Sequence, residues 1–238
     1  MIKINSEIKT KKFVDAVGEL DFDENDIPLL TLENVKKIDD YVKEYSSYAE
    51  GWNNVKEYFE EHKGDTCVSS IITKIILIDA LDSTNLKKQL GKDYFVLMAK
   101  RIKDSNIEEQ IATGNPIEKK IFENIASWPV KEGKKKEDMN LFIFLSKYIT
   151  RINELSYGRN DYSIMDNVIR KNIYHLRNNT NKSFVPARGK LSKYRNDYDY
   201  EGYCAAMGKI IDNFPGITRS MLDHFVWFVF KEPAANDK

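Results

Sequence analysis

The sequence predicts an all-α protein with two helical lobes. Apolar residues recur at i, i+3 and i+4 spacing along most of the chain, which is the period of an amphipathic helix. The 238 residues include only six prolines and eleven glycines, and no segment shows the apolar and polar alternation of a half-buried strand. We expect an acidic N-terminal helical lobe over residues 1–65 and a larger helical core with basic loops over residues 66–238.

The first long helix is expected to follow the segment DFDENDIPLLT and to run over residues 32–62. Its apolar and aromatic residues trace one stripe, which indicates a helix that is buried on one side. The stripe consists of Val35, Ile38, Tyr41, Val42, Tyr45, Tyr48, Trp52, Val55 and Phe59. Residues 1–62 contain 8 Lys and Arg against 15 Asp and Glu, so the stripe lies in an acidic lobe and is a candidate protein interface.

The helices of the core are expected to begin after Gly64 and Asp65. Thr66 is a candidate cap for the segment CVSSIITKIILIDALD, whose apolar residues cover nearly its whole circumference, as is typical of a central buried helix. Pro116 suits the first turn of a later helix. Further helices are expected over residues 92–104, 107–112, 116–126, 141–155, 166–176, 198–213 and 218–230.

The segment FIFLSKYITRINELSYGRNDYSIMDNVIR, residues 142–170, contains the most specific candidate site. Lys147 interrupts an apolar helix and has Phe144 and Arg151 as neighbours at helical spacing, surroundings that favour use of a lysine as a nucleophile. Asp166, 19 positions later, is placed to cap the next helix while one oxygen points outward. A lysine and a carboxylate of this kind are able to cleave a glycosidic bond through an imine.

These residues resemble the helix-hairpin-helix DNA glycosylase superfamily, whose members carry a lysine near the start of one core helix and an aspartate entering the next. The upstream segment IILIDALDSTNL resembles the buried helix that, in those enzymes, ends in a polar segment reaching into the duplex. Downstream, RSMLDHFVWF resembles a closing helix of uncharacterised bacterial and phage-borne proteins that also have SK…YxIxDxxV segments. The resemblance covers residues 71–231 and implies a two-lobed helical glycosylase fold.

The resemblance implies a DNA base-excision glycosylase, with or without lyase activity. Lys147 would form a Schiff base at the sugar C1′, and Asp166 would stabilise the developing cation. Ser83, Thr84 and Asn85 would fill the gap that an extruded base leaves in duplex DNA, the implied partner. Residues 131–195 carry 15 Lys and Arg against 6 Asp and Glu, so phosphate contacts are expected there. The candidate contacts are Lys134, Lys135, Lys136, Arg151, Arg188, Lys190 and Lys193.

The sequence departs from the superfamily at the hairpin. A glycine turn of the LPGVG type should precede Lys147, but DMNLFIFLS stands there, so the hairpin is expected to be divergent or absent. The chain has two cysteines, Cys67 and Cys204, which excludes the four-cysteine iron–sulfur cluster of some members. The three histidines are dispersed without metal-ligand spacing. We therefore expect neither a metal nor a cofactor.

Each candidate residue also has a purely structural interpretation. Lys147 is able to lay its stem along apolar surface with its ammonium in water, and Asp166 is a common type of helix cap. Asn85 tolerates the left-handed conformation that ends helices, and the lysine run at residues 134–136 is typical of a solvated loop. Only the order and spacing of these residues favour catalysis.

The alternative function is a non-catalytic DNA-binding or protein-interaction module linked to phage defence or mobile elements. The chain has no apolar run of 18 or more residues and no signal-peptide pattern at its N-terminus. We expect a cytoplasmic protein that does not bind membranes, with a protein partner possible at the acidic N-terminal helix.

Overall fold

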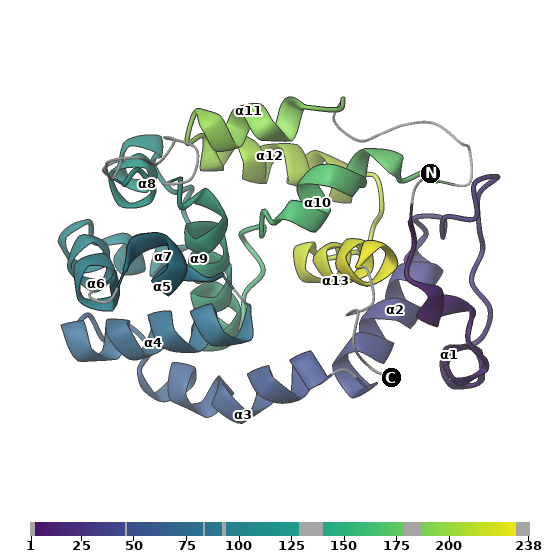
Figure 1. Ribbon diagram of the computed structural model, residues 1–238, viewed down its shortest axis with the longest axis horizontal. Coiled ribbons are helices and arrows are strands. Elements are labelled where there is room, and N and C mark those ends of the chain that lie inside the picture. Colours follow the sequence, from purple (N-terminus) through teal and green to yellow (C-terminus); the bar gives the residue numbers. More distant parts are fainter. Residues whose placement is uncertain are drawn as a thin grey trace. The chain divides into compact units, whose positions relative to one another are not determined.

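The computed structural model describes residues 3–45, 47–82, 84–91, 94–128, 140–178 and 187–231. Within these ranges the regular elements are helices, which confirms the all-α prediction (Figure 1). Two isolated β-bridges, Phe22 with Pro28 and Ser127 with Asn140, extend into no strand among the described residues. A helix needs roughly 20 consecutive apolar residues to span a bilayer, and none in the described part of the chain is long and apolar enough.

The chain divides into two compact units. The first unit comprises Met1–Glu50, Asp166–Lys190 and Ala206–Lys238, and the second comprises Gly51–Met165 and Leu191–Ala205. The predicted lobe boundary at residue 65 falls inside the second unit.

The first unit is organised around an aromatic cluster. The Phe13 ring lies 4.8 Å from Tyr41 and 5.7 Å from Phe228, so one cluster joins three helices. The helices α1 and α13 both pack on α2, and α10 packs on α13. The elements of this unit are η1 (Ser6–Lys9), α1 (Lys11–Val17), α2 (Leu32–Tyr45), α10 (Asn167–Asn172), η3 (Ile173–His175) and α13 (Arg219–Phe230).

The second unit has the buried helix α9 at its centre. α9 packs against α4, α7 and α8, and α4 packs against α6 (Figure 1). Buried side chains, both apolar and polar, occupy most of the α9 circumference, because the helix has neighbours on several sides. The elements lying wholly in this unit are α4 (Val68–Leu81), α5 (Leu86–Leu90), α6 (Tyr94–Asp104), α7 (Ile107–Thr113), α8 (Lys119–Ala126) and α9 (Phe142–Tyr157).

Three helices have residues in both units. They are α3 (Ser47–Glu61), α11 (Lys190–Asn196) and α12 (Tyr200–Ile211). In place of the single helix predicted over residues 32–62, the structure has α2 and α3, and Ser46 between them lies outside the described residues.

Two of the predicted helix starts are wrong. Cys67, not Thr66, stands at the N-cap position of α4, and it makes no side-chain cap hydrogen bond. The Asp65 carboxylate accepts a hydrogen bond from the N–H of the extended Cys67 at 2.9 Å, and the helix begins at Val68. Pro116 precedes α8, which begins at Lys119, because Glu118 at the N-cap position still has a non-helical ψ of 133°. The short helices α1, α5 and α11 were not predicted from apolar periodicity, because five to seven residues are too few to show it.

Candidate functional site

Lys147 lies on α9 and is partly exposed. Its Nζ donates a hydrogen bond to the Asp82 carbonyl oxygen at 3.0 Å. Asp82 is the residue that ends α4, where carbonyl groups lack partners within the helix and the helix dipole is negative. The ammonium therefore stabilises the end of α4, and the structural interpretation of Lys147 has a definite contact.

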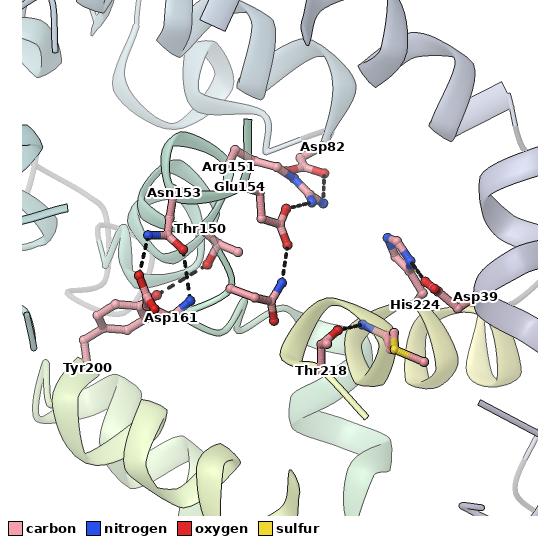
Figure 2. A network of polar contacts seen from close by, with 12 residues as sticks. Asp39, Asp82, Thr150, Arg151, Asn153, Glu154, Asp161, Tyr200, Thr218 and His224 are labelled. Atoms are coloured by element: carbon pink, nitrogen blue, oxygen red, sulfur yellow. Dashed lines mark hydrogen bonds and ion pairs between the residues drawn. The ribbon is translucent and has the colours of Figure 1, made fainter. Parts of the chain in front are cut away.

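Arg151 lies one turn after Lys147 and contacts the same residue. Its Nε and Nη2 lie 3.3 and 3.4 Å from the two Asp82 carboxylate oxygens, and its Nη1 lies 2.7 Å from Glu154 Oε2 (Figure 2). The guanidinium carbon is 4.9 Å from the Trp52 ring centroid. Arg151 is 5% exposed, so its side chain is packed within the second unit. Its predicted contact with a DNA phosphate stays a prediction.

The Asp79 carboxylate, in the last turn of α4, binds three residues that follow the helix. One Asp79 oxygen accepts hydrogen bonds from the Thr84 hydroxyl and from the Leu86 N–H, and the other accepts one from the Tyr94 hydroxyl at 2.8 Å. Burial and the Asp79 charge raise the pKa of Tyr94. Asn85 is exposed and has a left-handed φ of 57°, which asparagine tolerates, but it lies directly before α5 and does not end α4, whose C-cap is Asp82. Ser83 lies outside the described residues.

The sequence analysis missed the roles of Asp79 and Asp82. Their signal was two acidic residues, three positions apart, that follow the apolar run IILI at the end of α4. Acidic residues are unfavourable at the C-terminal end of a helix unless cations or hydrogen-bond donors compensate them. Lys147, Arg151, Thr84 and Tyr94 supply that compensation.

A buried ion pair between Lys74 and Glu108 contacts Tyr148, the residue that follows Lys147 in the sequence. Lys74 is 0% exposed, and its Nζ lies 2.7 Å from Glu108 Oε2. The other Glu108 oxygen accepts a hydrogen bond from the buried Tyr148 hydroxyl. Burial and the nearby Glu108 charge raise the pKa of Tyr148 well above its ordinary value. This group ties α4, α7 and α9 together through residues that the sequence analysis did not single out.

Asp166 caps α10, as predicted. The Asp166 Oδ1 accepts a hydrogen bond from the Ile169 N–H at 2.8 Å, and the residue is 9% exposed. Asp166 belongs to the first unit and Lys147 to the second. The predicted catalytic pair therefore stays a prediction.

The backbone just before Asp166 is fixed within the second unit. The Tyr200 hydroxyl donates to the Ser163 carbonyl at 3.1 Å, and the Tyr203 hydroxyl donates to the Ile164 carbonyl at 2.5 Å. The Ser146 Oγ accepts a hydrogen bond from the Met165 N–H at 3.1 Å. Two tyrosines of α12 and one serine of α9 thus determine the path of residues 163–165.

The predicted phosphate contacts fall into two groups. Lys134, Lys135 and Lys136 lie outside the described residues. Arg188, Lys190 and Lys193 are described and exposed, the first two in the first unit and Lys193 in the second. Among the described residues, no group of three or more His, Cys, Asp or Glu side chains is arranged to hold a metal ion.

His224 has a buried partner that the sequence analysis missed. In the first unit, its Nδ1 lies 2.6 Å from Asp39 Oδ1, which joins α13 to α2 (Figure 2). Lys43 contacts the other Asp39 oxygen at 2.6 Å. Burial alone would raise the pKa of Asp39, but the hydrogen bonds from His224 and Lys43 hold it below its ordinary value. Asp39 and His224 are 185 positions apart in the sequence, so no local sequence pattern links them.

Comparison with known proteins places the chain in a family. No match was found among curated proteins or among solved structures. The HI_0787_N family, described as an N-terminal domain, matches residues 33–157, which is just over half of the 238 residues. The match includes Asp79, Asp82, Lys147 and Arg151 and ends before Asp166. This chain belongs to the HI_0787_N family.

Proposed function

We propose that this protein is a DNA base-excision glycosylase that uses Lys147 as its nucleophile and Asp166 as its carboxylate. The observation that carries the proposal is the hydrogen bond between Ser146 and Met165. These residues directly precede Lys147 and Asp166 in the sequence. The Ser146 side chain thus holds the backbone of Met165, 19 residues later, and the two bonded residues stand immediately before the two candidate groups. The resemblance to helix-hairpin-helix glycosylases supports the same assignment.

In the proposed reaction the neutral Lys147 amine attacks the sugar C1′. The bond between C1′ and the base nitrogen breaks, and its electron pair leaves with the base, which takes up a proton. The Lys147 nitrogen then loses a proton to Asp166. As the nitrogen lone pair forms the double bond to C1′, the C1′–O4′ bond breaks and Asp166 returns its proton to O4′, which leaves a protonated imine between Nζ and C1′. The Asp166 carboxylate also stabilises the positive charge that develops on the sugar before attack is complete.

Before the reaction, the Lys147 amine is held at the end of α4 by its hydrogen bond to Asp82. The Nζ must leave the Asp82 carbonyl oxygen before it attacks, and a hydrogen bond from a charged donor is worth about 1.5 to 3 kcal/mol net. That cost is small beside the barrier that a glycosylase lowers. Arg151 holds the Asp82 carboxylate independently, so the end of α4 keeps a cationic partner when Lys147 moves.

Borohydride trapping tests the proposal, because it reduces an imine to a stable amine that links protein and DNA. The full chain is incubated with duplexes that contain an abasic site or one of a panel of damaged bases. We expect a covalent product with the wild-type protein and with Lys103→Arg, a control at an exposed lysine of α6. Lys147→Arg keeps the charge but cannot form the imine, so it should give no product while binding DNA with the same salt dependence.

The second candidate is a non-catalytic DNA-binding module. The contacts of Lys147 and Arg151 with Asp82 favour it, because they give both side chains a structural role. This function predicts salt-dependent DNA binding with no trapping on any substrate of the panel. Trapping that is equal in wild-type protein and Lys147→Arg would instead exclude Lys147 as the nucleophile.

A further inference from the structure

The side chains of His175, Arg177 and Arg188 lie near one another at the end of η3 in the first unit. The Arg188 guanidinium carbon lies 5.5 Å from the Tyr174 ring centroid, and the Tyr174 and His175 rings are 4.2 Å apart. The centroid of the His175 ring also lies 6.5 Å from that of Phe230 of α13. Arg177 follows two positions after His175. These side chains therefore come from two segments that flank one aromatic platform.

Arg177 is held in place by its own backbone surroundings. Its Nη1 lies 3.1 Å from the Tyr174 carbonyl oxygen and 2.8 Å from the Leu176 carbonyl oxygen. Its own carbonyl accepts a hydrogen bond from the Leu30 N–H at 2.8 Å, which fixes the chain on the loop before α2. Among the described residues, its Nε and Nη2 make no hydrogen bond. A guanidinium anchored by one nitrogen and open at the others is suited to binding an anion.

The cluster has no compensating carboxylate among the described residues. Neither Arg177 nor Arg188 forms an ion pair with an acidic side chain of that part of the chain. Burial lowers the pKa of His175, and the two arginine charges lower it further. Groups of like charge that are gathered without a counter-charge repel one another, and a bound anion removes that repulsion.

We infer that His175, Arg177 and Arg188 form a phosphate-binding site, with Tyr174 as the platform that orients the Arg188 guanidinium. A planar guanidinium binds two phosphate oxygens at once, and the imidazole supplies one further donor. For the identity of the phosphate, a backbone phosphate of DNA, this inference rests on the proposed function. The site itself requires only a phosphate group and does not depend on Lys147.

The test follows the His175 ring signals of the full-length protein by NMR during pH titrations. The titrations are made without ligand, with inorganic phosphate and with a short undamaged DNA duplex, at constant ionic strength. We expect either ligand to raise the His175 pKa, because phosphate neutralises the arginine charges and accepts a hydrogen bond from the protonated ring. Arg188→Gln should weaken binding of the effective ligand about fivefold, the size expected for loss of one exposed ion pair. Lys12→Gln on α1 is the matched control at an exposed cation of the same unit.

The possible results distinguish failure of the phosphate site from failure of the proposed glycosylase. A shift with both ligands that Arg188→Gln weakens and Lys12→Gln does not supports a DNA phosphate site. A shift with inorganic phosphate alone supports the anion site and removes its link to DNA. A His175 pKa that neither ligand changes, or equal binding by wild-type protein and Arg188→Gln, overturns the inference even if borohydride trapping succeeds.

Discussion

The Ser146 side chain and the Met165 backbone form a buried hydrogen bond that joins α9 to the segment before α10. The Ser146 Oγ lies 3.1 Å from the Met165 nitrogen, 3.3 Å from the Met165 carbonyl oxygen and 2.9 Å from the Ile143 carbonyl oxygen. Ser146 is 0% exposed, so water does not replace these contacts. In the proposed enzyme, this serine sets the positions from which Lys147 and Asp166 extend.

Ser146→Ala should therefore affect both stability and catalysis. The Met165 N–H loses its buried partner, so we expect the free energy of unfolding to fall by about 1 to 3 kcal/mol. Loss of the positioning contact should also lower the rate of borohydride trapping. Urea unfolding and trapping kinetics measure the two effects.

Ser156→Ala is the control for this variant, because Ser156 is a second buried serine of α9. Its Oγ donates to the Phe59 carbonyl oxygen at 2.9 Å, far along the helix from Lys147. It should lower stability by a similar amount and leave trapping unchanged at temperatures where both variants are folded. Equal trapping rates for the two variants would show that Ser146 has a structural role alone.

Substitutions of Asp166 separate capping from catalysis. Serine is as good a helix cap as aspartate, whereas alanine costs about 1 kcal/mol at this position. We expect Asp166→Ser to keep nearly the wild-type unfolding midpoint and Asp166→Ala to lower it. Both should lose trapping, because neither has a carboxylate. If Asp166→Ser traps at the wild-type rate, the proposed role of the Asp166 carboxylate is wrong.

Removal of Glu108 should be among the most destabilising changes in the second unit. Glu108→Ala leaves the Lys74 ammonium buried without its carboxylate, and loss of one partner from such a pair costs about 3 to 5 kcal/mol. The double variant Lys74→Met with Glu108→Leu should be less destabilised than Glu108→Ala, because no charge stays buried. Glu109→Ala, at the exposed neighbouring position, should change the unfolding midpoint little. A double variant that unfolds as easily as Glu108→Ala would contradict this account.

The Asp39 carboxylate should make the stability of the first unit depend on acid pH. Its pKa is lower in the folded protein, so its contribution is fully present above the unfolded value of about 3.9 and is lost as the pH falls through the folded value. We expect Asp39→Asn to cost about 2 kcal/mol at pH 7 and progressively less as the solution is acidified below pH 4. Urea unfolding at a series of pH values measures the difference.

Asp40→Asn is the control for this pH dependence, because Asp40 is the exposed neighbour on the same helix. It should lower stability little at any of these pH values. A difference between Asp39→Asn and wild type that stays constant down to pH 2 would mean that Asp39 does not titrate as described.

The helices themselves could be predicted from the sequence, because a helix depends on contacts between residues three and four positions apart. The apolar stripes and the Asp166 cap follow from such local patterns. The same rules failed at Thr66, where the Asp65 side chain accepts a hydrogen bond from the Cys67 N–H, and for the short helices α1, α5 and α11. Local chemistry thus determined the all-α class and most of the helix positions.

The partners of the charged side chains were decided by the tertiary structure. Arg151 pairs with Asp82, Lys74 with Glu108 and His224 with Asp39, in each case across a long stretch of sequence. The sequence shows that an apolar helix carries Lys147 and Arg151 one turn apart and that two acidic residues stand near the end of α4, but it does not show that these two segments meet. The physical reason is that burial makes an unpaired charge costly, so packing of the helices selects which opposite charges come together.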